Sequence, residues 1–263
     1  MNRNERAKAA KFWATAKVLH VYDGQVRTEI LSSASFEDSD LRIYIGQVNG
    51  EHYFAVNAPF DAESKNMREI STEISDETLE IYVTALALCN WHERHPRCPR
   101  CGSATEVIQN GWVRRCPADG TDHFPRTDPA IIVAVQDRHG RLCLGHQASW
   151  QEGRYSNFAG FVEPGETLEA AVIREVKEES NLDVVEIKYL MSQPWPFPNS
   201  MMLAFEAFTD SPELAAADGE EIADLKWFTR EDLIEAVKSK VINTPPLTSV
   251  SGKMIQMWLN GKR

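Results

Sequence analysis

The segment from residue 95 to about 126 restricts the fold of this chain most, because it cannot form a hydrophobic core of its own. It is rich in proline and glycine, and three of the cysteines lie within it. A stretch of this size usually needs a disulfide or a bound metal to hold it together. With 263 residues in all, the chain is long enough for a compact domain on each side. We therefore expect three regions, over residues 1–94, 95–126 and 127–263.

The three cysteines of this segment have the spacing of a zinc ribbon with one ligand replaced. Cys98-Pro-Arg-Cys101-Gly is a C-x-x-C knuckle, whose two thiolates can share one tetrahedral zinc ion. Cys116-Pro-Ala-Asp119 repeats the spacing with an aspartate where the fourth thiolate is expected, and His123 follows shortly after. We predict a structural zinc site that uses the three thiolates and, as fourth ligand, either His123 or Asp119. The alternative is a ribbon that has lost its metal and is held by packing alone.

Charge and composition exclude several classes of function. The chain has 28 Lys and Arg against 39 Asp and Glu, a formal net charge of −11, so bulk electrostatics do not attract nucleic acid or anionic lipid. The polar start of the chain has no apolar region of a secretory signal, and the longest clean apolar run, residues 130–135, is too short for a membrane helix. An odd number of cysteines, five, argues against a disulfide framework. We expect a cytoplasmic protein with no membrane partner.

Short apolar runs predict the secondary structure on both sides of the cysteine segment. In the first region, strands are expected near residues 41–46 and 52–56, followed by a helix over 76–94. We interpret this region as a β-rich accessory domain closed by a helix. After residue 127 strands and helices are mixed, which indicates an α+β domain. The expected strands lie at 130–135, 141–145, 184–191, 201–208 and 225–228, and the expected helices at 167–181 and 251–260.

A glutamate-rich turn near the end of the first of these helices is the strongest functional signal. Thr167 is a suitable N-cap, and a helix over 168–180 places three glutamates on one face, namely Glu175, Glu178 and Glu179. Three carboxylates this close repel one another, and a hard divalent cation removes that cost. We therefore predict Mg²⁺ or Mn²⁺ as a cofactor. Taken alone, such a turn is usually a solvated charged surface.

The spacing around this turn resembles the Nudix box. From Gly160 the sequence matches G-x5-E-x7-R-E-U-x-E-E-x-G-U, where U is aliphatic, at every position except Asn181, which replaces the second glycine. The resemblance implies a Nudix α/β/α sandwich and the hydrolysis of a nucleoside diphosphate linked to another group. By position, Glu166 and Arg174 pair and fix the loop against the helix, and Glu178 is a metal ligand or the base. The metal ligands implied are the carbonyl of Ala159 and the carboxylates of Glu175, Glu178 and Glu179.

A second motif narrows the range of expected substrates. Residues 192–200 read Ser-Gln-Pro-Trp-Pro-Phe-Pro-Asn-Ser, in which the prolines stiffen an extended segment and Trp195 and Phe197 offer aromatic surface. On its own, this run favours a rigid loop whose aromatic rings fill a core. After a Nudix box, it closely resembles the signature of the NADH pyrophosphatase subfamily. Three other stretches agree with that subfamily: residues 88–101, 124–132 and 221–228.

The subfamily resemblance implies cleavage of NAD(H) into AMP and nicotinamide mononucleotide, removal of NAD caps from RNA 5′ ends, and a homodimer. It adds Glu221 as a further metal ligand. Phe124 is expected to stack on a base, Ser251 to lie near the adenosine part, and Arg68 is a candidate from the first region. The full set of implied substrate-binding residues is Phe124, Gln193, Pro194, Trp195, Pro196, Phe197, Pro198, Asn199, Ser200, Ser251 and Arg68.

Two other functions stay open at this point. A hydrolase of another nucleoside diphosphate derivative, such as ADP-ribose or a dinucleoside polyphosphate, would use the same chemistry, but residues 192–200 argue against it. A non-catalytic nucleotide-sensing or nucleic-acid-binding module has no need for Glu175, Glu178 and Glu179 together. No glycine-rich phosphate loop supports an oxidoreductase or a kinase. The acidic composition also predicts few contacts to RNA beyond the cap.

Overall fold

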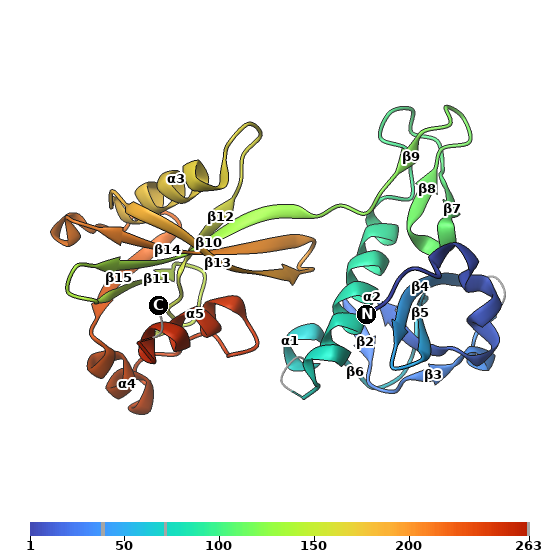
Figure 1. Cartoon of the computed structure of the whole chain (residues 1–263), viewed down its shortest axis with the longest axis horizontal. Coiled ribbons are helices and arrows are strands. Elements are labelled where there is room, and N and C mark those ends of the chain that lie inside the picture. Colours follow the sequence, from blue (N-terminus) through green and yellow to red (C-terminus); the bar gives the residue numbers. More distant parts are fainter. Residues whose placement is uncertain (38–39, 71–72, 262–263) are drawn as a thin grey trace. The chain divides into compact units, whose positions relative to one another are not determined.

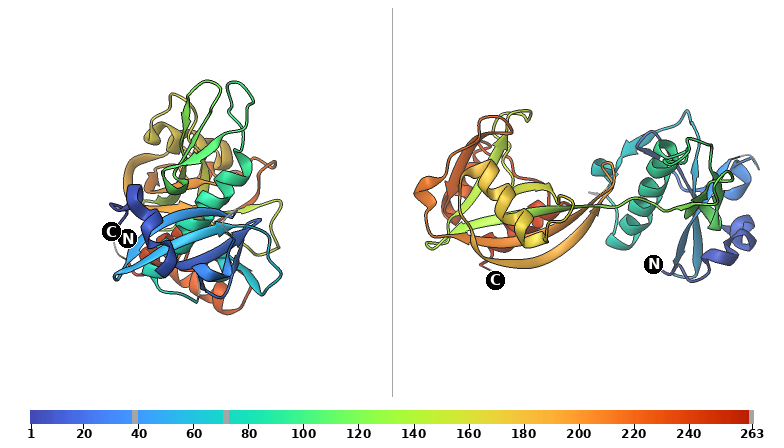
Figure 2. Two further views of the ribbon diagram at one scale, coloured as in Figure 1. Left: turned by 90° about the vertical axis from the view of Figure 1, so that its right-hand side faces the viewer. Right: turned by 90° about the horizontal axis from the view of Figure 1, so that it is seen from above.

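The structure is a computed structural model, and the residues it describes are 1–37, 40–70 and 73–261, without the side chains of 67, 68 and 76. Figure 1 shows its helices and strands, and Figure 2 shows them from two further sides. None of the helices in the described ranges is long and apolar enough to cross a membrane.

The chain folds into two compact units. One short segment lies in a different unit from the residues on either side of it in the sequence. Unit 1 contains residues 1–127 together with 196–199. Unit 2 contains residues 128–195 and those from 200 onward. The finer division predicted at residue 94 stays a prediction.

Besides the ribbon segment, the described residues of unit 1 form a six-stranded sheet, two α-helices and three 3₁₀ segments. The strands are β1 (Lys17–Tyr22), β2 (Gln25–Arg27), β3 (Leu31–Ser32), β4 (Leu41–Val48), β5 (Glu51–Asn57) and β6 (Ser64–Asn66). The helical segments are η1 (Arg6–Thr15), η2 (Ser33–Ser35), α1 (Met67–Ile70), α2 (Asp76–Arg94) and η3 (Gln109–Gly111). The strand order is β4-β5-β1-β2-β6, with β3 on β1, and β1 runs parallel to β5. The strands predicted near 41–46 and 52–56 and the helix predicted over 76–94 are confirmed.

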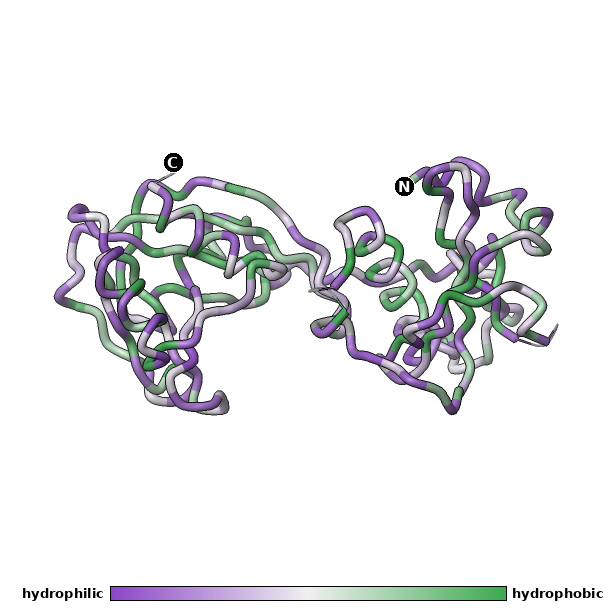
Figure 3. Tube along the Cα trace, turned by 90° about the horizontal axis from the view of Figure 1, so that it is seen from below, coloured by the Kyte–Doolittle hydropathy of each residue, from purple (hydrophilic) through white to green (hydrophobic). Residues whose placement is uncertain are grey.

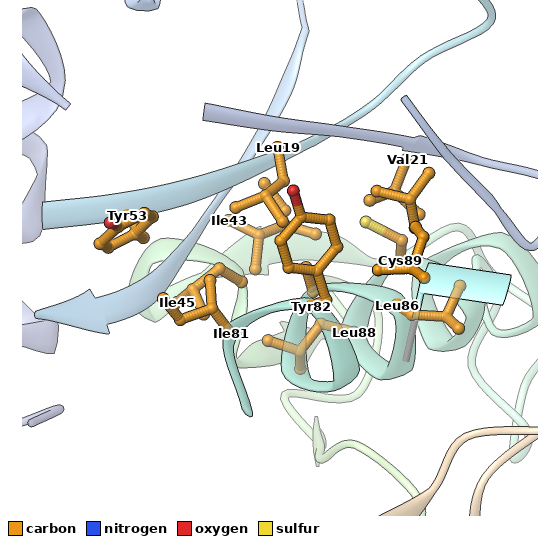
Figure 4. Close-up of a cluster of buried hydrophobic side chains, with 14 residues drawn as sticks. Leu19, Val21, Ile43, Ile45, Tyr53, Ile81, Tyr82, Leu86, Leu88 and Cys89 are labelled. Carbon is orange, nitrogen blue, oxygen red and sulfur yellow. The ribbon is translucent and has the colours of Figure 1, made fainter. Parts of the chain in front are cut away.

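Alternation along the strands gives each face of this sheet its own apolar cluster. Ile43 and Ile45 of β4 pack with residues of α2, whereas Tyr44, between them, packs with residues of η1 on the other face. Figure 4 shows the α2 cluster, which includes the buried thiol of Cys89, and burial raises the pKa of that thiol. In Figure 3 apolar residues concentrate along the strands and helices inside unit 1. Cys89 is therefore a core residue.

The ribbon segment is a small antiparallel sheet that a buried guanidinium joins to α2. Its strands pair in chain order and are β7 (Glu106–Ile108), β8 (Val113–Arg115) and β9 (Asp122–His123). Arg114 donates hydrogen bonds to Nδ1 of His92 in α2 (2.9 Å) and to the hydroxyl of Thr105 (2.7 Å). His92 Nε2 donates to the carbonyl oxygen of Gly111 (2.8 Å), so its Nδ1 accepts and carries no proton. Burial, and then the charge of Arg114, lower the pKa of His92 to about 4.

Unit 2 contains a second mixed sheet with helices on both sides. Its strands are β10 (Asp128–Asp137), β11 (Leu142–Gln147), β12 (Phe158–Phe161), β13 (Val185–Trp195), β14 (Ser200–Thr209) and β15 (Ile222–Phe228). Its helical segments are α3 (Leu168–Ser180), η4 (Pro212–Leu214), α4 (Arg230–Lys238) and α5 (Val250–Leu259). The strand order is β13-β14-β10-β11-β15, with β12 on β10. All the elements predicted after residue 127 are confirmed, whereas β12, η4 and α4 were not predicted.

The central strand β10 divides the core of unit 2 into two layers. Ile131 and Val133 pack with residues of α3, whereas Ile132 and Ala134 pack with residues of α5. Figure 1 shows α3 on one face of the sheet and α4 and α5 on the other. This is the three-layer α/β/α sandwich that the resemblance implied, so the predicted fold is confirmed.

The hydrogen bonds of His92 predict a loss of stability on acidification. The folded protein keeps His92 neutral, with its pKa near 4 instead of the ordinary 6.5. The unfolded chain therefore binds the extra proton, and stability falls as the pH drops below 6.5 toward the folded value. Between pH 7 and 5, this group should lower the free energy of unfolding by about 2 kcal/mol. Urea unfolding of the full chain, followed by tryptophan fluorescence at both pH values, measures the loss.

His92→Gln is the matched control, because its amide can donate to Gly111 and accept from Arg114 without titrating. Its loss of stability between the same two pH values should be smaller than that of the wild type by about 2 kcal/mol. An equal loss in both proteins would contradict the assignment to His92.

Candidate active site and zinc site

Helix α3 begins and ends where the sequence predicts. The Thr167 hydroxyl accepts a hydrogen bond from the Ala170 backbone N–H (3.2 Å), and Asn181 ends the helix in the left-handed conformation with φ of 58°. Asn181 therefore takes the conformation for which the Nudix pattern uses glycine. Val172 and Val176 are fully buried against the sheet, which fixes the rotation of the helix and hence the directions of its glutamates.

Arg174 is the centre of an ionic network on this helix. Its Nε and Nη2 atoms donate to the two carboxylate oxygens of Glu166, at 2.7 and 2.8 Å. Nη1 donates to Glu175 (2.8 Å) and Glu178 (3.0 Å), and Nη2 also reaches the carbonyl oxygen of Phe161 (2.9 Å). The bonds from Arg174 lower the pKa of Glu166 to about 2. The contact predicted between Glu166 and Arg174 is thus present, and it ties the loop to the helix.

Glu179 is almost completely buried, at 3% exposure. Burial, followed by the charges of Glu221 and Glu175, raises its pKa to about 8. It accepts a hydrogen bond from the backbone N–H of Ala159 (3.3 Å). Burial also raises the pKa of Glu175, although Arg174 opposes this. Buried carboxylates that repel one another are an environment that a hard divalent cation stabilises, so these residues fit Mg²⁺ or Mn²⁺.

Strand β12 approaches α3 so closely that a Cβ atom at position 160 would meet the carboxylate of Glu175. A Cβ atom on Gly160 would lie 1.9 Å from Cδ of Glu175. The preceding residue, Ala159, pairs with Ile132 of β10, and its N–H reaches Glu179. The first glycine of the box is therefore required by the space that Glu175 occupies. The metal-binding role of the Ala159 carbonyl stays a prediction.

Glu221 joins the site from the loop before β15. Gln147 of β11 donates to its Oε1 atom (3.0 Å), and the Ala148 N–H donates to its backbone carbonyl (3.1 Å). The charge of Glu221 raises the pKa values of Glu175 and Glu179, so these carboxylates share one region of unit 2. Among the described residues they do not close into a group with all ligand atoms within 4.8 Å, as the cysteine cluster does.

The ribbon contains two knuckles with the same backbone shape. In the first, the Gly102 N–H donates to the Cys98 carbonyl (2.9 Å), and in the second the Gly120 N–H donates to the Cys116 carbonyl (2.9 Å). The two glycines have φ of 74° and 73°, which only glycine adopts without strain. Asp119 in the second knuckle therefore has the position that the second cysteine has in the first.

These knuckles bring together four side chains that can hold zinc. The ligand atoms of three thiols and one carboxylate lie within 4.8 Å of one another, from Cys98, Cys101, Cys116 and Asp119. Hydrogen bonds from Thr121 lower the pKa of Asp119 to about 2, so it is an anionic ligand. This donor set fits a tetrahedral zinc ion. The other predicted fourth ligand, His123, pairs with Arg114 in the ribbon sheet and lies outside this cluster, and its role as a ligand stays a prediction.

The Pro-aromatic segment is divided between the two units. Residues 193–195 end β13, whereas residues 196–199 belong to unit 1. There the Pro196 carbonyl accepts a hydrogen bond from Asn90 of α2 (3.2 Å), and Phe197 packs against the apolar cluster of α2. The ring of Phe197 therefore contributes to a core, as the structural interpretation of the motif expected. The substrate-binding role of this segment stays a prediction.

Gln193 and Ser251 each form hydrogen bonds near the start of α5 in unit 2. Gln193 donates to the carbonyl of Thr248 (2.8 Å) and accepts from the backbone N–H of Val250 (2.6 Å). The Ser251 hydroxyl accepts from the Asn157 side chain (2.9 Å) and is buried. Both predicted residues thus have partners within the protein. Their contact with the adenosine part of a substrate stays a prediction.

The remaining predicted substrate residues lie in unit 1. Phe124 is 65% exposed and lines a cavity of about 760 Å³ together with Arg94 and Arg97. An exposed phenyl ring can stack on a base, and for Phe124 this role stays a prediction. Arg68 is in α1, but its side chain lies outside the part of the chain that the structure describes, so its role also stays a prediction.

Three residues near the glutamates were missed in the sequence. Phe161 is 56% exposed and its carbonyl binds Arg174, but an aromatic residue in a short strand gives no signal that separates an exposed ring from a core ring. Asp218 supports the loop before β15, and the Asp218-Gly219 pair is a turn signal that could have located it. No sequence pattern marks Gln147.

Comparison with known proteins identifies the family. Residues 126–248 match the NUDIX domain, and residues 93–124 match the NADH pyrophosphatase zinc ribbon domain. The chain is 34% identical over 283 residues to the NAD-capped RNA hydrolase NudC of Mycobacterium bovis, covering 97% of this chain and 90% of that protein. This chain belongs to the NudC family of Nudix hydrolases. The identity and coverage are the same for NudC of Mycobacterium tuberculosis.

A human relative of the NudC family, the NAD-capped RNA hydrolase NUDT12, is 35% identical over 199 residues, which cover 71% of this chain and 43% of that protein. The predicted resemblance to the NADH pyrophosphatase subfamily is confirmed by these matches. The predicted cofactors agree with the two domains: a divalent cation for the Nudix domain and zinc for the ribbon.

Asp119→Ala should weaken zinc binding about tenfold or more, because it removes one of four ligands. Asp119→Cys should bind at least as tightly as the wild type, since it completes a set of four thiolates. His123→Ala is the control and should leave zinc binding unchanged. The measurement is the release of zinc to a chromophoric chelator at neutral pH. Full retention of zinc in Asp119→Ala would exclude Asp119 as a ligand.

Gly160→Ala should reduce Mn²⁺-dependent hydrolase activity by about 100-fold, because the added methyl displaces the Glu175 carboxylate. Initial rates measure this, and circular dichroism verifies that the variant is folded. Glu175→Gln combined with Gly160→Ala should show little further loss, because both changes act on the same carboxylate. An active Gly160→Ala protein would show that Glu175 can move without consequence.

Proposed function

We propose that this chain hydrolyses the pyrophosphate of NAD(H) to AMP and nicotinamide mononucleotide with Mg²⁺ or Mn²⁺. The observation that carries the proposal is the crowding of Glu175 and Glu178 around Arg174, with Glu179 buried beside them. The substrate class follows from the relatives, since the mycobacterial and human proteins are NAD-capped RNA hydrolases. The motif over residues 192–200 supports the same class.

The chain contributes carboxylates for the cation. Glu175, Glu179 and Glu221 would hold a divalent cation, which would offset the charge of the pyrophosphate and lower the pKa of the attacking water. Because burial raises the pKa of Glu179 to about 8, Glu179 releases a proton when it becomes a ligand near neutral pH.

Glu178 is our candidate for the base. Its side chain is 60% exposed, against 14% for Glu175, so it is better placed to reach a water beside the substrate. A hydrogen bond from Arg174 to one of its oxygens (3.0 Å) fixes its orientation. The guanidinium nitrogens of Arg174 are all engaged by protein groups, so Arg174 orients the carboxylates and does not clamp the substrate phosphates.

The same site can remove an NAD cap from RNA, because the bond that breaks is the same pyrophosphate bond. The names of the relatives support RNA 5′ ends as substrates. The net charge of −11 disfavours tight sequence-independent binding of the RNA body. Recognition should therefore centre on the cap, and salt should affect capped RNA little more than NAD itself.

We also propose that the protein is a cytoplasmic homodimer, as the family resemblance implies. None of the five cysteines, all of which lie in the described residues, is in a disulfide, which suits a reducing compartment. Light scattering of the purified chain tests the dimer, whose mass should be twice the 29.7 kDa of the monomer.

Product analysis tests the substrate. Purified protein is incubated with Mn²⁺ or Mg²⁺ and NADH, NAD⁺, ADP-ribose or a dinucleoside polyphosphate. AMP and nicotinamide mononucleotide should form, with NADH cleaved fastest. Turnover of only the other nucleotides would keep the hydrolase and overturn the NAD(H) assignment, and no turnover at all would favour a nucleotide-sensing module.

Glu178→Gln should reduce hydrolysis by at least about 100-fold, the contribution typical of a general base. The Kd for NADH should stay unchanged, because the amide keeps the shape of the side chain. Chromatography of the products gives the rates, and calorimetry with Ca²⁺ gives the Kd. Glu169→Gln, an exposed glutamate on the same helix, is the matched control. Full activity in Glu178→Gln would remove Glu178 from the catalytic residues.

A further inference from the structure

We infer that Asp218 is a positioning residue that, together with Gln147, holds Glu221 in the orientation needed to bind the catalytic cation. The inference rests on the proposed function, because Glu221 is a metal ligand only within that proposal. Asp218 itself is not available as a ligand in this arrangement, because the backbone of its own loop occupies its carboxylate.

The Asp218 carboxylate collects three successive backbone N–H groups. Its Oδ1 atom accepts from Glu220 (3.1 Å), Glu221 (3.2 Å) and Ile222 (2.8 Å), and its Oδ2 atom also accepts from Glu221 (3.3 Å). Gly219 has φ of 77° and donates its N–H to the Ile222 carbonyl (3.1 Å), which turns the chain back on itself. The side chain of Asp218 therefore closes the turn, and Glu221 stands in the middle of it.

The end of β11 and the residue after it bind two further polar atoms of Glu221. The Ala148 N–H donates to its backbone carbonyl (3.1 Å), and Gln147 Nε2 donates to its Oε1 atom (3.0 Å). The pairing of β11 with β15 shifts register between His146 and Gln147, and such irregularities redirect side chains beside functional sites. Among the described contacts, this leaves the Oε2 atom of Glu221 for a cation.

Glu221 needs this support because its neighbours repel it. Its charge raises the pKa values of Glu175 and Glu179, and the repulsion acts equally on Glu221. An exposed loop carboxylate without support would turn toward solvent until a cation arrived. The bonds from Asp218 and Gln147 hold it in place beforehand, so the loop loses less freedom when the cation binds.

The test removes the hydrogen bonds of Asp218 and measures cation binding directly. Asp218→Ala should weaken Mn²⁺ binding about tenfold, as loss of a residue that orients a metal ligand typically does. The electron paramagnetic resonance signal of free Mn²⁺, recorded on the zinc-loaded full chain, gives the affinity. The Mn²⁺ concentration for half-maximal NADH hydrolysis should rise by the same factor, while kcat at saturating Mn²⁺ changes little. Asp218→Asn should restore most of the affinity, because its amide oxygen accepts the same N–H groups.

Two further variants sharpen the test. Glu220→Gln removes one negative charge from the same loop without removing an acceptor of the turn, so it should bind Mn²⁺ as the wild type does. Gln147→Ala leaves the turn intact and should also weaken Mn²⁺ binding. If circular dichroism shows that Asp218→Ala does not fold, Gln147→Ala provides the test in its place.

Wild-type affinity in both Asp218→Ala and Gln147→Ala would overturn the inference. It would also be overturned if Asp218→Asn bound Mn²⁺ as weakly as Asp218→Ala, since the charge and not the hydrogen bonds would then matter. A wild-type protein that binds Mn²⁺ but does not hydrolyse NADH would sink the proposed function alone, because the resonance measurement still decides the role of Asp218.

Discussion

Repulsion between carboxylates is the constraint on which the site in unit 2 depends. Helix α3 can place Glu175 and Glu178 side by side because the positively charged guanidinium group of Arg174 donates hydrogen bonds to both. The same guanidinium binds Glu166, so the group that offsets the charge also ties the preceding loop to the helix. Glu179 has no described bond to Arg174 and is buried, and its pKa is raised to about 8. The position that is least stable as an anion is therefore the one that gains most from a metal ion.

The layered core is what makes this arrangement rigid. Alternate residues of β10 pack against α3 and α5, so the sheet fixes the rotation of α3 about its own axis. Strand β12 then passes so close to the helix that a side chain at position 160 would displace the carboxylate of Glu175. Packing and electrostatics thus act on the same side chain: the core directs Glu175 toward β12, and Arg174 holds it there. A shift of either layer would move the carboxylate.

Features with a local cause could be predicted from the sequence, and features that depend on distant segments could not. Thr167 and Asn181 set the ends of α3 through their own backbone and side-chain geometry, so the helix was predicted to the residue. The partner of Phe197 is the core around α2, more than a hundred residues earlier, and a Pro-aromatic run contains no information about it. The support of Glu221 by Gln147 likewise depends on the pairing of β11 with β15.

The fourth zinc ligand shows the same distinction within a single turn. Sequence spacing left His123 and Asp119 as alternatives, because both follow Cys116 closely enough to reach a shared ion. The backbone favours Asp119, because Gly102 and Gly120 close two equivalent turns and the residue before each glycine has the same place in its turn. The backbone shape of each knuckle thus depends on its glycine and not on the side chain before it. A carboxylate at position 119 is therefore compatible with the same turn. An oxygen donor suits zinc less well than sulfur, so with Asp119 as fourth ligand this ribbon would hold zinc less tightly than four thiolates would.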